Sequence, residues 1–445
     1  MTPTTTTSLT AWGRSSASMS RVWRATAPEH VAAAMSAAGP RGVIARGYAR
    51  SYGDVCLNDG GEVLDLTAYS AIHSFDVETG TLCCDAGTSY REIMQHCLPM
   101  GWQPAACPGT SFVSMGGAIA NDVHGKNQHG VGSFGDHLDW FDLRLADGTV
   151  RRVAPETDPE LFAATVGGIG LTGVIQSLQF RLVRVPSNAM ELTQRRVPDL
   201  DALLDLLQSS ASQYPYVVGW LDALTSGRHM GRGILELARP ATTPVRNPSP
   251  FSVSVPFEFP GFVLNRQTVR AFNAAYYRRI PASGRERSIH VDKFLYPLDA
   301  IHDWNRMYGR RGVYQFQCVV PFADGRRAIM ALMDEIVRSR STSFLAVLKS
   351  MGRHGRGLLS FPMPGFTLAL DFPRRHDTRA LILRLYDIVL EYGGRIYLAK
   401  DACLSADHLD AMYSDVGRFK AVLHRVDPDG RLQSDMSRRL NLSGR

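Results

Sequence analysis

The chain has 445 residues, 44% of them hydrophobic, 20% charged and 9% aromatic, which is an ordinary globular composition and too long for a single core. No run of roughly 18 apolar residues occurs, which excludes a transmembrane helix. Residues 1–30 hold no apolar stretch for a secretory signal, so we expect a cytoplasmic protein. The net charge of +7 suits an anionic substrate or membrane surface, whereas its diffuse distribution argues against nucleic-acid binding.

The cysteine and lysine content limits the kinds of site that the chain can form. Seven cysteines without a Cys-x-x-Cys spacing predict a reduced compartment and argue against a zinc site or a disulfide framework. Most basic side chains are arginine, and the lysines are Lys126, Lys293, Lys349, Lys400 and Lys420. Each lysine can therefore be examined individually for a functional role.

The first part of the chain predicts short strands joined by glycine turns. After a Thr/Ser-rich tail, residues 40–65 are typical of a strand, a glycine loop and a second strand. Further strands are expected over 71–77 and 81–85, followed by a helix within 88–101 that ends at a glycine. Residues 140–153 predict a hairpin with an Asp-Gly turn.

From about residue 185 the pattern changes to amphipathic helices and buried strands. Helices are expected over 199–213, 325–340 and 376–392, with a buried strand over 216–224. Two stretches are typical of loops: the Pro-, Ser- and Thr-rich residues 238–260, expected to be mobile, and the polar residues 278–288. We find no internal repeat.

Gly168, Gly170 and Gly173 match the spacing of the dinucleotide fingerprint, which requires a helix directly after the glycines. The residues that follow are VIQSLQFRLV, which are β-branched and alternating, and predict a strand. We therefore reject a nicotinamide-binding Rossmann fold. The glycines are interpreted as sites of close backbone approach.

Residues 108–136 carry the strongest functional signal: PGTSFVSMGGAIANDVHGKNQHGVGSFGD holds seven glycines among polar residues. Exposed N–H groups in such a loop can bind a pyrophosphate. His124, His129 and His137 lie near Asp122 and Asp136, but their spacing matches no metal site, so we expect no metal.

Three segments resemble the FAD domain of flavoproteins of the vanillyl-alcohol-oxidase (PCMH) type: RGYARSYGD, PGTSFVSMGGAIANDVHGKN and VGGIGLTGVI. More narrowly, the chain is similar to the family of FAD-dependent oxidases that act in the 2-epimerisation of decaprenylphosphoryl-β-D-ribose. Further matches follow in order: YPLD, FLAVLKSMG, LSFPMPGF, LDFP, GGRIYLAKD and SDMSRRL. The resemblance spans residues 46–440.

The resemblance implies an α+β fold in which a two-subdomain FAD-binding domain carries a cap-like α+β substrate domain. Residues 1–185 would form the N-terminal part of the FAD-binding domain, and 186–394 the substrate domain. Residues 395–445 would return to the FAD-binding domain. The change of pattern near residue 185 agrees with this division.

The resemblance also implies which residues contact FAD. The first glycine loop would wrap the pyrophosphate, the second glycine segment would bind the phosphates and pass the flavin, and three later residues would contact the adenine end and the ring. These residues are Ala45, Arg46, Gly47, Tyr48, Ala49, Arg50, Ser51, Tyr52, Gly53, Asp54, Val55, Gly109, Thr110, Ser114, Met115, Gly116, Gly117, His124, Gly125, Lys126, Asn127, Val174, Ile175 and Tyr397. Many relatives attach FAD through a histidine in the first loop, which this chain lacks, so we expect non-covalent FAD.

Oxidation of a secondary alcohol by flavin needs a group that takes the hydroxyl proton. Lys400 in the LAKD segment is the first candidate, and the alternative interpretation is a surface lysine paired with Asp401. Tyr52 and His124 are the other catalytic candidates. The expected substrate contacts are Lys126, Trp220, Tyr296, Gln317, Lys349, Ala369 and Lys400. Trp220 fits a core position equally well, and Ala369 stands where family members often carry a cysteine.

The family's substrate would be a polyprenylphosphoryl-β-D-ribose, oxidised at C2 to the 2-keto sugar that a partner NAD(P)-dependent reductase converts to the arabinose form. The Pro-rich loop and an arginine-bearing loop suggest peripheral contact with the inner membrane. Two alternatives stay open: a soluble sugar, alditol or aldonolactone oxidase of the same superfamily, and a non-catalytic binding protein with a degenerate flavin fold. The length of the prenyl chain and the electron acceptor are not specified by the sequence.

Overall fold

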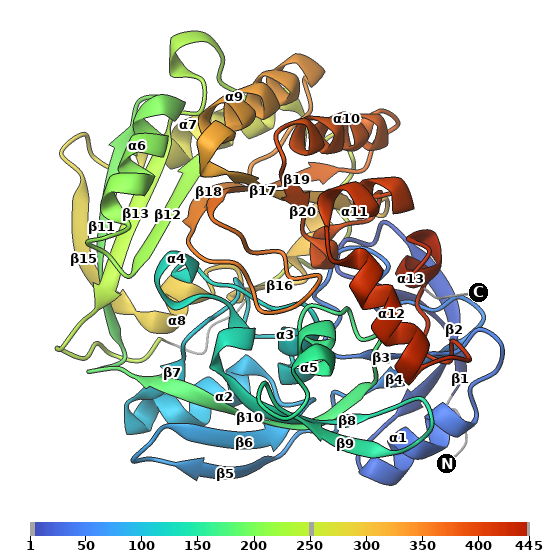
Figure 1. Cartoon of the computed structure of the whole chain (residues 1–445). Helices are drawn as coiled ribbons and strands as arrows, with labels where there is room; N and C mark the ends of the chain where they lie inside the picture. The colour runs from blue at the N-terminus through green and yellow to red at the C-terminus, as the bar shows by residue number, and fades with distance from the viewer. Residues whose placement is uncertain (1–4, 249–252, 443–445) are drawn as a thin grey trace.

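The computed structural model describes residues 5–248 and 253–442. The described residues form four β-sheets, of four, six, eight and two strands, and helices pack around them (Figure 1). This arrangement confirms the expected α+β class. Three helices near the C-terminus return to the side of the molecule where the N-terminal sheet lies (Figure 1).

The N-terminal sheet has the order β1-β2-β4-β3. The strands are β1 (Thr5–Thr10), β2 (Ala17–Arg24), β3 (Val43–Arg46) and β4 (Glu62–Asp65), and α1 (Pro28–Ser36) packs against β2 and β4. The Thr/Ser-rich segment that we expected to be a tail is therefore largely β-structure. Threonine is β-branched and favours strands, but six polar residues without apolar alternation gave no strand signal.

The six-stranded sheet has the order β5-β6-β10-β8-β9, with β7 also paired to β10. Its strands are β5 (Ile72–Asp76), β6 (Thr81–Asp85), β7 (Trp102–Pro104), β8 (Leu138–Arg144), β9 (Val150–Val153) and β10 (Val174–Arg184). The predicted hairpin is confirmed as β8 and β9, with Gly148 in the turn at a φ of +87°. The strand predicted after Gly173 is confirmed as β10, so no helix follows these glycines.

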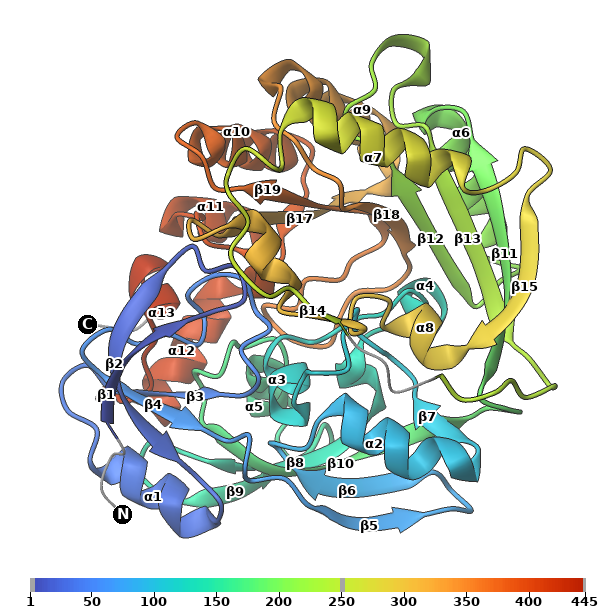
Figure 2. The same ribbon diagram turned by 180° about the vertical axis from the view of Figure 1, so that it is seen from behind.

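The eight-stranded sheet has the order β15-β11-β13-β12-β18-β19-β17-β20. Its strands are β11 (Ala189–Val197), β12 (Tyr216–Leu221), β13 (Gly233–Pro240), β15 (Arg285–His290), β17 (Val313–Pro321), β18 (Ala346–Met351), β19 (Gly365–Pro373) and β20 (Arg395–Ile396). The predicted helices are α6 (Leu200–Ser210), α9 (Phe322–Ser339) and α10 (Thr378–Glu391). Figure 1 shows α6 over one face of this sheet, and Figure 2 shows α7 (Arg266–Arg278) over the other.

The two stretches expected to be loops differ from that expectation in part. Residues 285–290 form β15, an edge strand whose side chains are mostly exposed, so it lacks the apolar alternation that marks a buried strand. The Pro-rich stretch contains the end of β13 and the short β14 (Val253–Ser254), which pairs with β16 (Ile301–His302). Residues 249–252 of the expected mobile loop lie outside the described residues.

The remaining elements are short or C-terminal. They are α2 (Tyr90–Cys97), η1 (Leu98–Met100), α3 (Met115–Ala120), α4 (Gln128–Val131), η2 (Phe134–His137), α5 (Pro159–Thr165), η3 (Gly227–His229), α8 (Val291–Leu295), η4 (Trp304–Tyr308), η5 (Leu398–Lys400), α11 (Ala406–Met412), α12 (Val416–Val426) and α13 (Asp435–Arg439). The chain enters the large sheet between β10 and β11. It leaves this sheet again after β20.

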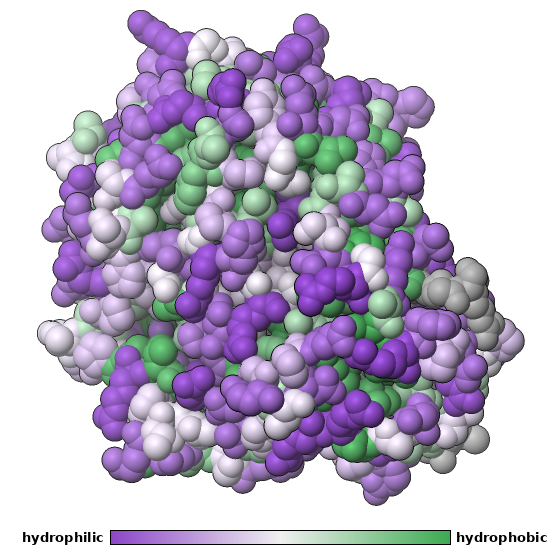
Figure 3. Space-filling view, viewed as in Figure 1, coloured by the Kyte–Doolittle hydropathy of each residue, from purple (hydrophilic) through white to green (hydrophobic). Residues whose placement is uncertain are grey.

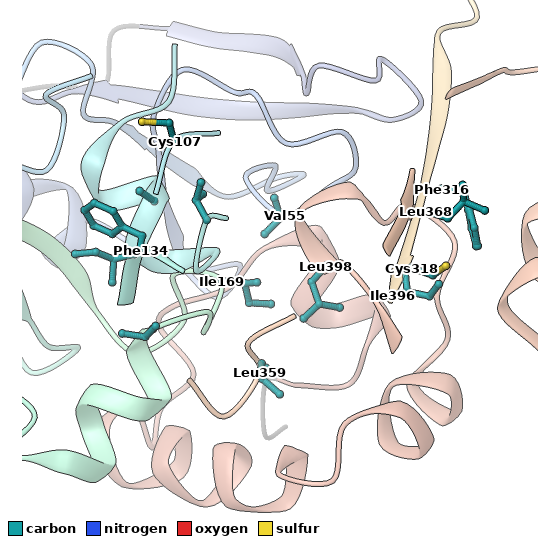
Figure 4. Close-up of a cluster of buried hydrophobic side chains, with 14 of the residues drawn as sticks. Val55, Cys107, Phe134, Ile169, Phe316, Cys318, Leu359, Leu368, Ile396 and Leu398 are labelled. Carbon is teal, nitrogen blue, oxygen red and sulfur yellow. The ribbon is translucent and has the colours of Figure 1, made fainter. Parts of the chain in front are cut away.

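One buried cluster runs from the six-stranded sheet into the large sheet. Figure 4 shows Val55, Ile169 and Leu398 in this cluster, contributed by three distant segments, together with Phe316 of β17. The two sheets therefore share a continuous core. All seven cysteines are free.

The face of the molecule in Figure 3 is mostly hydrophilic, with apolar residues scattered among charged ones. Across the described part of the chain, no helix combines the length and hydrophobicity that a bilayer crossing requires.

Candidate active site

A deep cleft lies where the two glycine segments meet the large sheet. It holds about 2020 Å³ of non-protein space, counted to its open mouth. Most of its lining residues lie within the segments 45–56, 108–124, 169–175, 298–304, 315–317, 345–349 and 397–400.

The first glycine loop presents free backbone groups to this cleft. A Cβ on Gly47 would lie 2.2 Å from Ser114 Oγ, so only glycine allows the two loops to meet. Ala49 adopts a φ of +53°, a conformation rare for residues with a side chain. Within the described part of the chain, the N–H groups of Gly47 and Ala49 donate no hydrogen bond. These groups can bind an anion such as a pyrophosphate.

The second glycine segment forms the facing wall. Ser114 caps α3 and its hydroxyl accepts a hydrogen bond from Gly117 N at 3.3 Å. Gly116 packs against Ala86, where a Cβ would come within 3.0 Å of the Ala86 Cβ. Gly109 faces open space. The glycines thus allow the wall to approach a bound molecule closely.

Most of the residues expected to contact FAD line the cleft. They are Ala45, Arg46, Gly47, Tyr48, Ala49, Arg50, Ser51, Tyr52, Val55, Gly109, Thr110, Ser114, Gly116, Gly117, His124, Ile175 and Tyr397. The first loop, the second glycine segment and the returning C-terminal segment are therefore brought together as the resemblance implied.

Seven of the expected cofactor residues do not line the cleft, and their contact with FAD stays a prediction. Gly53 packs against Asp401 O, Asp54 is paired with Arg439, and the amide of Asn127 donates to Ala105 O at 2.8 Å. The others that do not line the cleft are Met115, Gly125, Lys126 and Val174. Because each of them stands within three positions of a lining residue, the motif alone could not separate the two groups.

Lys400 lies inside the cleft with its ammonium group over an aromatic ring. Its Nζ is 4.3 Å from the centroid of the Tyr52 ring, and Tyr52 N donates to Ala399 O at 3.0 Å. The alternative pairing with Asp401 is excluded, because Asp401 accepts from Arg439 at 2.9 Å and from Tyr386 at 2.8 Å. Lys400 is therefore free to face a ligand.

The buried lysines have unusual proton affinities. Burial lowers the pKa of Lys400 to about 8, although attraction to Asp371 opposes the shift. Burial, together with repulsion from Lys126 and Lys400, lowers the pKa of Lys349 to about 7. Burial also lowers the pKa of Lys126. Lys349 and Lys400 both line the cleft, so this end of it attracts anions and offers an amine that loses its proton near neutral pH.

His124 is held as a neutral imidazole. Burial, with the positive charges of Lys349 and Lys400, lowers the pKa of His124 well below its ordinary value. The Gln317 amide donates to His124 Nε2 over 3.1 Å, which places the ring proton on Nδ1. Within the described residues this Nδ1 is buried without a partner, so it can donate to a ligand.

The expected substrate contacts divide into two groups. Gln317, Lys349 and Ala369 line the cleft, and Gln317 faces Ala369 across the pairing of β17 and β19. Lys126, Trp220 and Tyr296 do not line it, and their contact with a substrate stays a prediction. Lys126 donates to Phe294 O, Trp220 donates to Phe344 O at 3.1 Å and packs on Tyr276, and Tyr296 is buried.

The cleft is also lined by residues that were not predicted from the sequence, among them Trp12, Asn121 and Gln315. Trp12 follows β1, in the segment interpreted as a tail. Asn121 Oδ1 is buried without a partner in the described part of the chain, which marks it as a ligand contact. Gln315 could have been found, because Gln315 and Gln317 alternate in a buried strand and must share a face.

The residues of the cleft fit FAD. Free N–H groups of the first loop suit the pyrophosphate, and unpartnered polar atoms of Asn121 and His124 face the interior. Tyr397 closes the inner end, held by a hydrogen bond from its hydroxyl to Asn121 O at 2.9 Å. Among the described residues no cluster of three or more His, Cys, Asp or Glu side chains could hold a metal ion.

Comparisons with known proteins agree with this geometry. The profile of the FAD binding domain matches residues 19–154, and that of D-arabinono-1,4-lactone oxidase matches residues 370–440. A decaprenylphosphoryl-β-D-ribose oxidase of Mycolicibacterium smegmatis is 36% identical over 99% of this chain and 98% of its own length. An uncharacterised protein of Streptomyces coelicolor is 32% identical over 78% of this chain and 97% of its own, and a rice cytokinin dehydrogenase is 26% identical over 46% of this chain and 41% of its own.

The fold and the cleft define an FAD-binding oxidoreductase with a PCMH-type cofactor domain. The full-length similarity narrows the class: the chain belongs to the decaprenylphosphoryl-β-D-ribose oxidase family.

Proposed function

We propose that this enzyme uses FAD to oxidise the C2 hydroxyl of a polyprenylphosphoryl-β-D-ribose to the 2-keto sugar. The observation that carries the proposal is Lys400, an amine of lowered pKa in a cleft that also fits a flavin. Full-length similarity to a decaprenylphosphoryl-β-D-ribose oxidase supports the substrate class.

FAD, when bound, supplies the acceptor for the two electrons and the hydrogen of the C2–H bond. Lys400 Nζ, in its neutral form, takes the proton of the C2 hydroxyl and becomes an ammonium ion, which later releases that proton to solvent. The face of Tyr52 stabilises that ammonium ion, because its ring lies 4.3 Å away. His124 Nδ1 donates a hydrogen bond that orients the sugar.

Lys349 is placed to bind the phosphate of the substrate. It lies on β18 at the same end of the cleft, and its charge is repelled by Lys126 and Lys400. An anion relieves this repulsion, so a phosphate stabilises the protonated form of Lys349. The cleft therefore favours a phosphorylated sugar over a neutral one.

Product analysis tests the proposed reaction. The enzyme is incubated with polyprenylphosphoryl-ribose in detergent, and the product is reduced with borodeuteride. Deuterium at C2, in ribose and arabinose epimers, is the expected result. Deuterium at another carbon, or recovery of unlabelled ribose only, would contradict the proposed chemistry.

The second candidate is a soluble sugar or aldonolactone oxidase, favoured by the match of residues 370–440 to D-arabinono-1,4-lactone oxidase. Peroxide formation with free arabinono-lactone or free pentoses, faster than turnover of the lipid-linked substrate, would support it. We expect little turnover of the free compounds, because they lack the phosphate that Lys349 would bind.

We propose that FAD is bound without a covalent link. The first loop reads Tyr48-Ala49-Arg50-Ser51-Tyr52 and offers no histidine for attachment. Acid precipitation should therefore leave FAD in the supernatant. A yellow pellet would show that another side chain holds the cofactor.

We also propose peripheral contact with a membrane through an arginine–phenylalanine surface. It consists of Arg310, Arg311, Arg374 and Arg375, which line one hollow with residues 258–261, and of Phe257 and Phe262, which flank that segment in the chain. Phe257 and Phe262 are 62% and 75% exposed. Within the described part of the chain, none of the four arginines is paired with a carboxylate. Exposed aromatic rings beside uncompensated arginines suit the interface of an anionic bilayer.

Co-sedimentation with phosphatidylglycerol vesicles tests this contact. Replacing Arg310 and Arg311 by glutamine should weaken binding, since each arginine near such a surface is worth about 1 kcal/mol. Phe257→Ser with Phe262→Ser should weaken it further. The matched control is Val150→Ser, a residue 48% exposed on the distant β9. Equal binding by all variants would contradict the proposed surface.

The 2-keto product requires a second enzyme that adds hydride at C2 from the other face. We propose a partner reductase that uses NAD(P)H, as the family relationship implies. Addition of such a reductase should raise the yield of arabinose epimer, with oxidation of NAD(P)H that depends on this protein.

A further inference from the structure

Asp371 is a fully buried carboxylate beside the catalytic end of the cleft. It lies on β19, directly opposite Gln315 in the pairing with β17. One carboxylate oxygen accepts from Gln315 Nε2 at 2.5 Å and the other accepts from the Tyr308 hydroxyl at 3.2 Å. Its backbone N–H donates to Ser343 Oγ at 3.3 Å. No residue of the described chain forms an ion pair with it.

A continuous set of contacts joins Asp371 to Lys400. Gln315 bonds to Asp371, lines the cleft together with Tyr52 and opposes the rise in the pKa of Tyr52. The ring of Tyr52 carries the Lys400 ammonium group at 4.3 Å. Tyr52 and Tyr308 belong to the same buried cluster, so this arrangement is fixed by packing. The carboxylate therefore acts on Lys400 from behind the Tyr52 ring and does not face the substrate itself.

We propose that Asp371 is a positioning residue that supplies the counter-charge for Lys400 and fixes its protonation through Tyr52, Gln315 and Tyr308. The inference rests on the proposed role of Lys400 in catalysis, but the interaction can be measured without turnover.

Asp371 supplies the negative charge that raises the pKa of Lys400 against the effect of burial. The titratable and charged groups that surround Lys400 and its neighbours are Tyr52, Tyr308, His124, Lys126, Lys349, Arg50 and Asp371. Arg50 is cationic, Lys126 and Lys349 are cationic when they are protonated, and His124 is neutral. The tyrosines keep their protons, because burial raises the pKa of Tyr52 and of Tyr308 well above the ordinary value. The negative charge of Asp371 therefore opposes the loss of a proton from Lys400.

Burial raises the pKa of Asp371 itself to about 6, so it is ionised over the range in which Lys400 titrates. The hydrogen bonds from Gln315 and Tyr308 stabilise the charged carboxylate and so limit the rise in the pKa of Asp371. Without that charge, burial would shift Lys400 toward the neutral amine still further. Asp371 thus holds Lys400 close to the point at which it can both accept and release a proton.

The small number of lysines makes a direct test practical. The FAD-loaded full chain is reductively methylated with ¹³C-formaldehyde, and the methyl resonances of its five lysines are followed against pH by NMR. In the wild-type protein we expect Lys400 to show a main titration step near pH 8 and a smaller step near pH 6, where Asp371 titrates. A Lys400 resonance with one step only and an ordinary alkaline midpoint would overturn the proposal.

Asp371→Asn removes the charge and keeps the shape. The Lys400 midpoint should fall by roughly one pH unit, about tenfold in proton affinity, and the smaller step should vanish. Asp371→Glu should restore both. The matched control is Asp303→Asn, a carboxylate that lines the cleft but does not act on Lys400. An unchanged Lys400 midpoint in folded Asp371→Asn, or an equal shift in the control, would refute the proposal.

Turnover separates this inference from the proposed function. In Asp371→Asn, the limb of the kcat/KM profile that reports Lys400 should move to lower pH, whereas a purely structural role would lower activity equally at every pH. If the NMR shift occurs but polyprenylphosphoryl-ribose is not oxidised, the substrate proposal fails and the role of Asp371 stands. If this substrate is oxidised but no shift occurs, the substrate proposal stands and the role of Asp371 fails.

Discussion

Arg439 is the residue whose loss should most clearly disturb the catalytic loop. It reaches back from α13 and binds Asp54 at 2.7 Å and Asp401 at 2.9 Å, so one guanidinium holds the first glycine loop beside the residue after Lys400. The Asp401 side chain is 0% exposed and Asp54 11%. Arg439→Met would leave two buried carboxylates without a cation. Breaking a buried pair in this way costs about 3–5 kcal/mol, and because Arg439 is 24% exposed we expect the lower end of that range.

Denaturant unfolding followed by circular dichroism, with flavin release monitored in parallel, measures this loss. Flavin release should rise together with this deficit, because the same guanidinium holds the first glycine loop. Arg418→Met is the control, since Arg418 is 64% exposed and pairs only with Asp415 within its own helix end. Its loss should stay within about 0.5 kcal/mol. A loss below about 1 kcal/mol for Arg439→Met would contradict a role for this buried ion-pair cluster in holding the loop.

Four further predictions follow from the cleft. Lys400→Ala should retain FAD but lose reduction by substrate, as judged by absorbance; reduction at the wild-type rate would exclude Lys400 as the base. Because the unfolded chain binds more protons than buried Lys349 between about pH 7 and 10.5, stability should rise with pH across that window. Lys349→Met should remove the share of this dependence that Lys349 contributes and leave the share of Lys400, which has the same sign above about pH 8. The same variant should gain on the order of 1 kcal/mol at pH 7 while raising KM, and a loss of stability would contradict this. Gly53→Ala should prevent folding around FAD, since its Cβ would lie 1.7 Å from Asp401 O. A soluble yellow variant would show that the loop can move enough to accommodate the added Cβ. Ala369→Cys should add one thiol reactive with maleimide in mass spectrometry, whereas no added label would mean that position 369 is closed to small molecules.

Local sequence patterns predicted the regular elements well. The hairpin of β8 and β9, the strand β10 and the helices α6, α9 and α10 all follow from turn residues and apolar periodicity within one segment. The strands β1 and β15 were missed, because both are largely exposed edge strands whose polar residues give no alternating signal.

Site residues could be predicted from the sequence only where they belong to a recognisable motif. Tyr52, His124 and Lys400 lie in recognisable segments, and the structure brings them into one cleft. Asp371 and Gln315 act through a cross-strand pair and a hydrogen bond, which no local pattern reveals. Tertiary packing also decides whether a residue of a motif lines the cleft or lies behind the lining residues.

The arrangement of sheets explains how distant motifs meet. Residues of the first glycine loop and the segment after β20 are about 350 positions apart in the chain, yet Tyr52 N donates to Ala399 O at 3.0 Å. Arg439 adds a charged contact between the same two segments. Sequence similarity indicated that both segments belong to the site, but their contact could be established only in three dimensions.

Anaerobic stopped-flow absorbance of the FAD-loaded enzyme mixed with polyprenylphosphoryl-ribose tests the proposed oxidation most directly. We expect bleaching of the visible flavin band that is slowed by deuterium at C2 of the ribose and not by deuterium at C3, and that is absent in Lys400→Ala. A flavin band that is unaffected by this substrate, or an isotope effect at C3 instead of C2, would contradict it.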